Sequence, residues 1–195
     1  MISNPQDELQ AQQAIEGELL DGEKILWTGQ PDPSKIFTAA DLFLIPFALF
    51  WISMPTMGGV SMLKDGDFSG ALFIVPFLLI GSYLLVGRFF YKSWAKRKTY
   101  YAVTDRRVIV INGGLKHRIA ASFIRDIVAV NSSINKNGEG MVIFGNASIF
   151  AASFGNSGFG TAENQTAPLP PIFYDLKNAQ EVLDLVNRLR NEQCR

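Results

Sequence analysis

The sequence predicts a mostly β fold of the α+β class: a small antiparallel barrel capped by a C-terminal helix, with a two-helix transmembrane hairpin attached. Three observations predict this. Two long runs without a charged residue follow each other in the first half of the chain. Several short segments of alternating apolar and polar residues come next, and the C-terminal residues repeat apolar side chains at helical spacing.

Charge and composition exclude several classes of protein. The 195 residues carry 18 Lys and Arg against 18 Asp and Glu, which excludes a nucleic-acid binder that relies on bulk positive charge. The single cysteine, Cys194, excludes a disulfide framework and a cysteine-built zinc site. The single histidine, His117, excludes any site that needs two histidines. We therefore expect no cofactor and no metal.

The two uncharged runs cover residues 42–63 and 68–87, with only Lys64, Asp65, Gly66 and Asp67 between them. As helices they would be about 33 and 30 Å long at ~1.5 Å per residue, which matches a hydrocarbon core of about 30 Å. The short polar connection makes them an antiparallel hairpin. The alternative is a pair of buried core helices in a soluble protein, although such helices seldom stay uncharged for so long.

Basic residues predict the orientation of this hairpin. Five Lys or Arg residues lie between positions 88 and 98, directly after the second run, whereas the connection holds only Lys64. The positive-inside rule then places the end of the second span, and with it both termini, in the cytoplasm. We expect an integral membrane protein with two spans.

The soluble part of the chain is neutral but polarised. Residues 1–41 carry eight acids against two lysines, and residues 88–107 carry seven basic groups against one acid. Either the acidic N-terminal segment folds back onto the basic segment, or the basic segment faces anionic lipid headgroups. Residues 4–20 are rich in Gln, Glu, Ala and Leu, so that residues 1–21 form an acidic, helical N-terminal segment.

Short strands account for most of the remaining chain. We expect strands within residues 22–31, 99–104, 107–112, 115–121, 124–134, 140–145 and 172–174, with residues 147–151 continuing the sixth. Residues 152–171 are rich in Gly, Asn, Ser, Thr and Pro and predict a long loop. Residues 175–193 form an amphipathic helix whose apolar stripe covers the strands.

Two sequence segments resemble the bacterial pleckstrin-homology-like (PH-like) membrane proteins. They are GEKILWTGQP at residues 22–31 and YYAVTDRRVIVI at residues 100–111, followed by the similar SFIRDIVAVN and GEGMVIFG. The resemblance covers most of residues 18–195. It implies a seven-stranded barrel closed by a C-terminal helix, without a shared catalytic activity. Residues 22–36 would then hold the first strand and residues 88–195 the rest of the PH-like domain, with the hairpin inserted between them.

Residues of the second segment also suggest local roles. Thr104 and Asp105 suit a tight turn, because their side chains can bond nearby backbone amides. Arg107 is placed to pair with a carboxylate or to cover a strand edge. The basic residues near the membrane are also candidate contacts for anionic lipid: Arg88, Lys92, Lys96, Arg97, Lys98, Arg106 and Arg107.

These observations predict a non-enzymatic module that recognises a protein partner or serves as a scaffold at the cytoplasmic membrane face. Expected partners are membrane lipids and a protein, including further copies of this chain, but not nucleic acid. The segment 152–171 is a candidate contact surface. The alternative is a lipid-binding or lipid-sensing module that uses the seven basic residues. An enzyme would require a pocket where groups such as Asp126, Glu139 and His117 converge.

Overall fold

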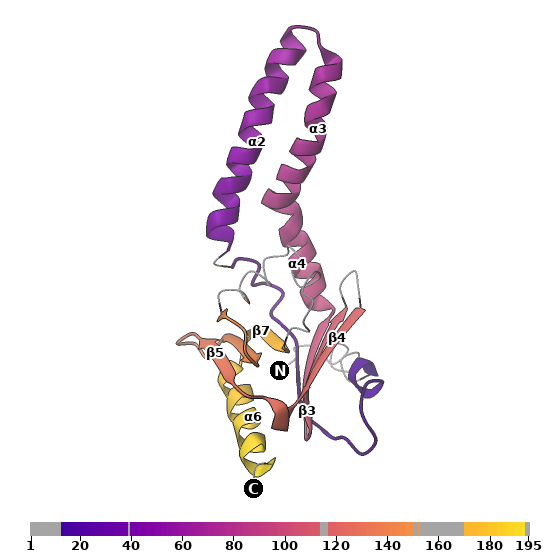
Figure 1. The fold of residues 1–195 in the computed structure, drawn as a ribbon, viewed down its shortest axis with the longest axis vertical. Helices are drawn as coiled ribbons and strands as arrows, with labels where there is room; N and C mark the ends of the chain where they lie inside the picture. The colour runs from indigo at the N-terminus through magenta and orange to yellow at the C-terminus, as the bar shows by residue number, and fades with distance from the viewer. Residues whose placement is uncertain (1–12, 39, 114–116, 150–151, 153–169, 194–195) are drawn as a thin grey trace.

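The computed structural model describes residues 13–38, 40–113, 117–149, 152 and 170–193. A long helical hairpin stands on one side of two antiparallel sheets, and the C-terminal helix lies beside the sheets, far from the tip of the hairpin (Figure 1). Gln13–Glu16 form a helical turn, and the rest of the predicted helix 4–20 up to residue 12 lies outside the described residues.

The first helix extends the predicted span 42–63 by one residue at each end, whereas the helical stretch that begins at residue 68 continues to 97, ten residues past the predicted end of the second span at 87. Helix α2 (Asp41–Lys64) runs through Pro46 and Pro55, and helix α3 (Phe68–Ser82) through Pro76. The Asp67 carboxylate begins α3 by accepting a hydrogen bond from the Gly70 amide at 2.9 Å. A π-helical turn, η1 (Tyr83–Gly87), joins α3 to α4 (Arg88–Arg97).

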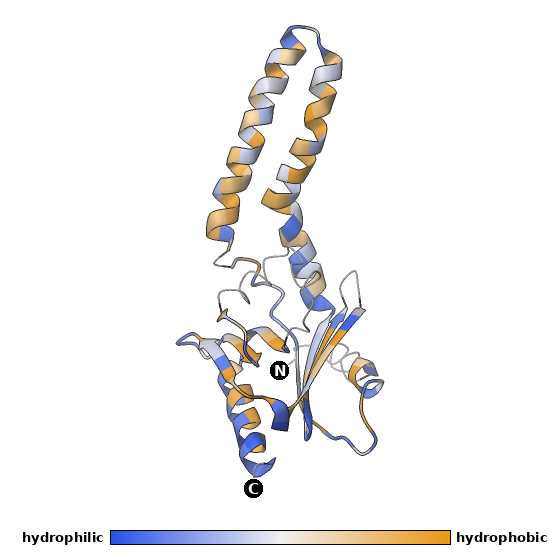
Figure 2. Cartoon of the chain, in the orientation of Figure 1, coloured by the Kyte–Doolittle hydropathy of each residue, from blue (hydrophilic) through white to orange (hydrophobic). Residues whose placement is uncertain are grey.

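By length and composition, Asp41–Lys64 and Phe68–Arg97 are each long and apolar enough to cross a membrane. Orange, apolar residues are most frequent along α3 and the lower part of α2, the upper part of α2 is paler, and blue residues gather at the turn and at the base of the hairpin (Figure 2).

The seven strands form two antiparallel sheets. Sheet A has the order β1-β2-β3-β4 and sheet B the order β5-β6-β7. Sheet A consists of β1 (Ile25–Gly29), β2 (Thr99–Thr104), β3 (Arg107–Gly113) and β4 (His117–Phe123). Sheet B consists of β5 (Val130–Ile134), β6 (Gly140–Phe144) and β7 (Ile172–Leu176). Helix α6 (Ala179–Gln193) follows β7. The predicted class, α+β with antiparallel sheets, a C-terminal helix and two apolar helices, is confirmed.

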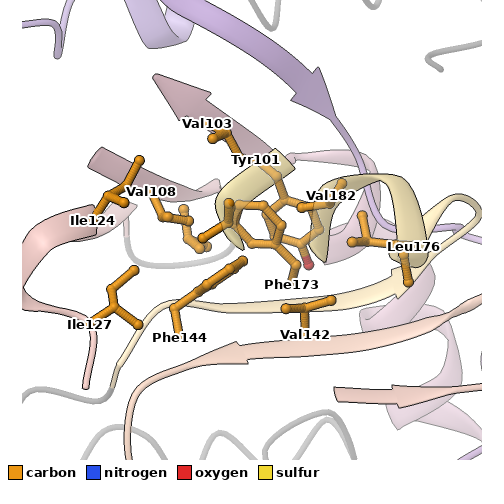
Figure 3. Packing of buried hydrophobic residues seen from close by; sticks show 13 residues of the cluster. Tyr101, Val103, Val108, Ile124, Ile127, Val142, Phe144, Phe173, Leu176 and Val182 are labelled. Atoms are coloured by element: carbon orange, nitrogen blue, oxygen red, sulfur yellow. The ribbon is translucent and has the colours of Figure 1, made fainter. Parts of the chain in front are cut away.

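One core joins both sheets and α6 (Figure 3). The Phe173 ring lies at its centre, 4.5 Å from the Tyr101 ring, 4.9 Å from Phe144 and 5.9 Å from Trp27. Buried Val182 and Val186 bring α6 into the same cluster. Burying side chains of this size stabilises a fold by about 1.5–3 kcal/mol each.

The opposite face of sheet A is apolar as well. Register pairs Ala102 with Ile109, and these two residues pack with Ile111 against the fully buried Ile15 of the N-terminal segment. Strands β2 and β3 are therefore covered on both faces, which explains their nearly continuous run of apolar residues.

Three predicted boundaries are wrong. The strand expected over 124–134 begins with a 3-10 turn, η2 (Ile124–Asp126), because Ile124 and Ile127 both reach the core from positions three apart; β5 starts at Val130. The helix expected from 175 starts at Ala179, because Asp175 and Leu176 end β7. Where a strand continuation was expected over 147–151, Ile149 has helical backbone and the Ala152 amide donates to the Ser148 carbonyl at 2.9 Å, while residues 150 and 151 lie outside the described residues.

Candidate functional site

Helix α4 turns three cationic side chains towards the inside of the protein. Arg88, Lys92 and Lys96 recur every four residues and so share one face of the helix. All three are buried. This is the reverse of an ordinary surface helix, whose charges face water. Buried charges need partners, and three segments of the chain provide them.

The Arg88 guanidinium is paired with Asp41, the first residue of α2. Arg88 Nη1 lies 2.6 Å from Asp41 Oδ1, and the two side chains are 0 % and 3 % exposed. The guanidinium also lies 4.6 Å from the centre of the Phe89 ring. The contact is an ion pair only, since neither Asp41 Oδ1 nor any nitrogen of the Arg88 guanidinium has a hydrogen-bond partner among the described residues. The pair therefore joins the bases of the two membrane-type helices.

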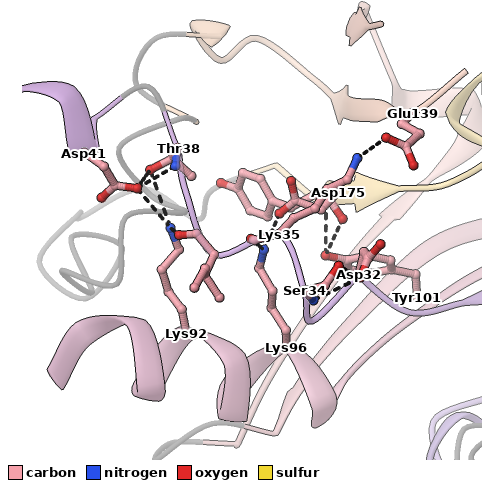
Figure 4. Close-up of polar contacts among 12 residues, drawn as sticks. Asp32, Ser34, Lys35, Thr38, Asp41, Lys92, Lys96, Tyr101, Glu139 and Asp175 are labelled. Carbon is pink, nitrogen blue, oxygen red and sulfur yellow. Dashed lines mark hydrogen bonds and ion pairs between the residues drawn. The ribbon is translucent and has the colours of Figure 1, made fainter. Parts of the chain in front are cut away.

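Lys92 lies one turn further along α4 and reaches the same carboxylate. Its Nζ donates to the Ile36 carbonyl at 2.5 Å and lies 3.7 Å from Asp41 Oδ2 (Figure 4). Asp41 Oδ2 also accepts hydrogen bonds from the Thr38 amide and hydroxyl. The connection that leads into α2 is thus bound to α4.

Lys96 extends the contacts to sheet B. Its Nζ lies 2.6 Å from Asp175 Oδ2 in β7 and also donates to the Lys35 carbonyl. Asp175 has a left-handed backbone, with φ at 51°, and its carbonyl accepts a hydrogen bond from the Asp32 amide at 3.0 Å. We call this set the ion-pair seam: Arg88, Lys92, Lys96, Asp41 and Asp175.

A second buried carboxylate joins the two sequence segments that carry the PH-like resemblance. Glu23 accepts hydrogen bonds from Thr104 Oγ1 at 2.7 Å and from Arg107 Nε and Nη2 at 3.0 and 2.7 Å. Arg107 also donates to the Glu18 carbonyl at 2.8 Å. Burial alone would raise the pKa of the Glu23 carboxyl, but these bonds and one from the Leu20 amide lower that pKa to about 2. We call Glu23, Thr104 and Arg107 the clasp.

The local role predicted for Thr104 in the turn after β2 is confirmed, whereas the Asp105 carboxylate bonds an amide of a distant segment instead of one in the turn. Thr104 Oγ1 accepts hydrogen bonds from the amides of Arg106 and Arg107, and Asp105 Oδ1 accepts one from the Lys24 amide at 2.9 Å. The Arg107 guanidinium pairs with a carboxylate, that of Glu23.

The seven candidate lipid contacts do not form one surface. Arg88, Lys92 and Lys96 are buried in the seam, and Arg107 belongs to the clasp. Arg97, Lys98 and Arg106 are exposed. Lys98 Nζ lies 4.4 Å from the centre of the Trp94 ring, and Arg106 lies on the turn after β2, 3.9 Å from Asp105.

The groups that an enzyme would have required lie apart. Asp126 is exposed and pairs with Arg125, whereas Glu139 pairs with Lys35. His117 begins β4. Among the residues that the structure describes, no three His, Cys, Asp or Glu side chains are gathered as metal ligands. Most of the candidate contact segment 152–171 lies outside the described residues.

Sequence reasoning missed Asp41, Asp175 and Glu23 as partners. The signal for two of them was present, because the acidic segment 1–41 and the basic segment 88–107 have opposite net charges. Asp41 and Glu23 of the acidic segment pair with Arg88, Lys92 and Arg107 of the basic segment. This agrees with the alternative in which the N-terminal segment folds back onto the basic segment. Comparison of the chain with family models, curated proteins and solved structures finds no match in any of the three.

Proposed function

We propose that this chain is a membrane-anchored PH-like module that acts without catalysis, by presenting a protein-recognition surface at the cytoplasmic face of the membrane. The resemblance implies a seven-stranded barrel closed by a C-terminal helix, and the seven antiparallel strands of the described chain, in two sheets followed by α6, support this assignment.

The ion-pair seam is the observation that carries the proposal. Asp41 links the base of α2 to α4, which continues the second span. Asp175 links strand β7 to the same helix. A flexible tether would serve a module that searches for its partner. A buried, charge-paired connection instead holds a recognition surface at a fixed height and orientation above the membrane, which suits a scaffold.

The charged groups support a non-catalytic role. The buried charged residues of the described chain are Glu23, Asp41, Arg88, Lys92 and Lys96. Each of them is engaged with an oppositely charged group inside the protein. A general acid or base has to reach a substrate, and these groups are committed to one another.

An exposed apolar strip on β4 is the surface that best fits a protein partner. Register places Ile119, Ala121 and Phe123 opposite Ile111, Ile109 and Arg107, so all three share the outer face of sheet A. They are exposed, whereas Ile109 and Ile111 are covered by Ile15. Strand β4 also ends the sheet, so that its outer edge can accept an added strand or support a helix.

Lipid recognition by all seven basic residues is the weaker alternative. Four of the seven are bonded to carboxylates within the protein, and freeing them would leave those carboxylates buried without a partner.

Site-specific photo-crosslinking in native membranes tests the proposal. A benzophenone amino acid replaces Phe123 in the full-length chain, and the control carries it at the exposed Arg188 of α6. We expect a reproducible adduct from position 123 only, and loss of that adduct on Ile119→Asp. The purified adduct protein should bind the full chain in nanodiscs at least tenfold more weakly after the same substitution. Equal adducts from both positions, or none from position 123, would overturn the recognition surface.

A further inference from the structure

The outward face of α4 has the opposite character to its inward face. Val86, Phe90 and Trp94 recur every four residues and point away from the seam, offset by two positions from Arg88, Lys92 and Lys96. Phe90 is 75 % exposed and Trp94 is 38 % exposed. The apolar stripe of the second span therefore continues for about two turns beyond Arg88, the first charged residue of this helical stretch. Arg97 and Lys98 follow the stripe.

The length of this continuous helix agrees with the stripe. Phe68–Arg97 has 30 residues, which corresponds to about 45 Å at ~1.5 Å per residue. A hydrocarbon core takes about 30 Å of that length, and a bilayer with both headgroup layers takes about 40–45 Å. If Gly87 ends the hydrocarbon part, Phe90 lies about 5 Å and Trp94 about 10 Å beyond it. These depths correspond to the headgroup layer and its outer rim.

Aromatic and cationic side chains are arranged at this level as they are at membrane interfaces. Lys98 Nζ lies over the Trp94 ring, whose centre is 6.0 Å from that of Tyr91. Phe37, 68 % exposed, brings a further ring to the level of Phe89, 5.0 Å away. Rings of this kind prefer the headgroup layer, and long basic side chains reach from there to lipid phosphates.

We propose that the outward face of α4, formed by Phe90, Trp94, Arg97 and Lys98, is a membrane-docking surface that lies in the headgroup layer and binds anionic lipid through its two cations. The occupant is the lipid headgroup layer, because this face continues the lipid-facing stripe of the same helix without a break. Arg88 then lies at the edge of the hydrocarbon part but pairs only with Asp41 inside the protein, as charges inside membranes do. The inference rests on the proposed membrane anchoring.

Cysteine labelling measures the depth of this face. Single cysteines replace Phe90, Trp94, Phe50 or Val128 in a Cys194→Ser chain reconstituted at one copy per phosphatidylcholine–phosphatidylglycerol nanodisc, and a membrane-impermeant maleimide is added. Phe50 is exposed in the middle of α2, and Val128 is exposed on the connection between the sheets. We expect position 90 to react at least tenfold more slowly than position 128, with position 94 between them.

The two controls separate this inference from the membrane anchor. Rapid labelling of position 90 with position 50 protected would overturn the docking surface alone. Rapid labelling of position 50 would overturn the anchor itself. A protein partner cannot protect position 90 in these discs, because each disc holds one purified chain.

Lipid retention tests the two cations. Native mass spectrometry counts the phosphatidylglycerol molecules that stay bound to the chain released from mixed-lipid discs. We expect the double variant Arg97→Gln with Lys98→Gln to lower the ratio of bound phosphatidylglycerol to bound phosphatidylcholine at least twofold. The matched pair Arg125→Gln with Arg188→Gln removes two exposed cations away from α4 and should leave it unchanged. Equal losses in both pairs would show that net charge rather than this face selects the lipid, and no loss in either pair would show that Arg97 and Lys98 do not bind it; both results would overturn the assignment of the two cations.

Discussion

At the scale of single residues, the buried Arg88–Asp41 ion pair is the contact in which each charge depends most strongly on its partner. An arginine stays protonated at any ordinary pH, so its buried guanidinium depends on the carboxylate 2.6 Å away. Removing one member of a buried ion pair is costly because the other charge stays behind, whereas replacing both members by apolar groups of similar volume is often tolerated.

Neutralising Asp41 should therefore destabilise the protein more than removing the whole pair. We expect Asp41→Asn to lower the free energy of unfolding by about 3–5 kcal/mol, and the double variant Asp41→Leu with Arg88→Met to lower it by less. Thermal unfolding of the full chain in detergent, followed by circular dichroism, measures both. Asp65→Asn, in the exposed turn of the hairpin, is the control. A double variant less stable than the single one would contradict the argument.

The clasp predicts a pH dependence at acid pH. The pKa of Glu23 is lowered to about 2 in the folded chain, against an ordinary value of 4.5. A group with a depressed folded pKa stabilises the fold above its unfolded pKa, and this contribution is lost as the pH falls from about 4.5 towards 2. The contribution is up to about 3 kcal/mol for a shift of this size.

The matched variant is Glu23→Gln, which keeps the shape of the side chain and removes its titration. We expect the midpoint of thermal unfolding to fall more steeply below pH 4.5 in the native chain than in this variant, so that their difference narrows towards pH 2. Parallel curves for the two proteins would show that Glu23 does not titrate as the clasp requires.

At the scale of elements, the π-turn η1 sets the direction that α4 faces. A π-turn accommodates one extra residue in a helix, and each residue of an α-helix rotates the following side chains by about 100°. The rotation at Tyr83–Gly87 brings Arg88 to Asp41 and, two turns later, Lys96 to Asp175.

One inserted alanine between Gly87 and Arg88 should turn this face away from both carboxylates. We expect that insertion to lower the midpoint of thermal unfolding markedly, because the buried Asp41 and the half-buried Asp175 lose their partners. The same alanine inserted between Asp65 and Gly66, in the turn of the hairpin, should change it little. Similar midpoints for the two insertions would mean that the direction of α4 does not matter.

Elements with a local signal could be predicted from the sequence, and contacts between distant segments could not. Strand β2 was predicted with the observed bounds because its alternation ends in a turn that Thr104 itself stabilises. The first residues of 124–134 were misjudged because their spacing fits a 3-10 turn as well as a strand. The direction of α4 could not be predicted, because a run of Lys and Arg after a span looks the same whether it faces lipid or an acid more than forty positions away.

For the whole molecule, the seam determines whether the hairpin and the sheets move as one. Arg88 and Lys92 bind Asp41, and Lys96 binds Asp175, so that two carboxylates connect three elements. Replacing both carboxylates by amides should leave the hairpin and the sheets formed but loosely connected.

Electron paramagnetic resonance distances can measure this connection. Nitroxides at Phe43→Cys and Arg188→Cys, both exposed, report the separation of the base of α2 from α6 in a Cys194→Ser chain. We expect a narrow distance distribution in that chain and a broader one after Asp41→Asn with Asp175→Asn. An equally broad distribution before and after the change would show that the seam does not restrain the two parts.

The position of the hairpin within sheet A has a consequence for how the protein is made. Strand β1 ends at Gly29, but its neighbour β2 starts only at Thr99, after both long helices. At about 5–20 residues per second, a ribosome takes several seconds to cover that interval. Throughout it β1 has no strand to pair with, and the hairpin reaches the insertion machinery first. With the proposed membrane anchoring, the hairpin would be available for insertion before sheet A can close, so that insertion can precede folding of the sheets.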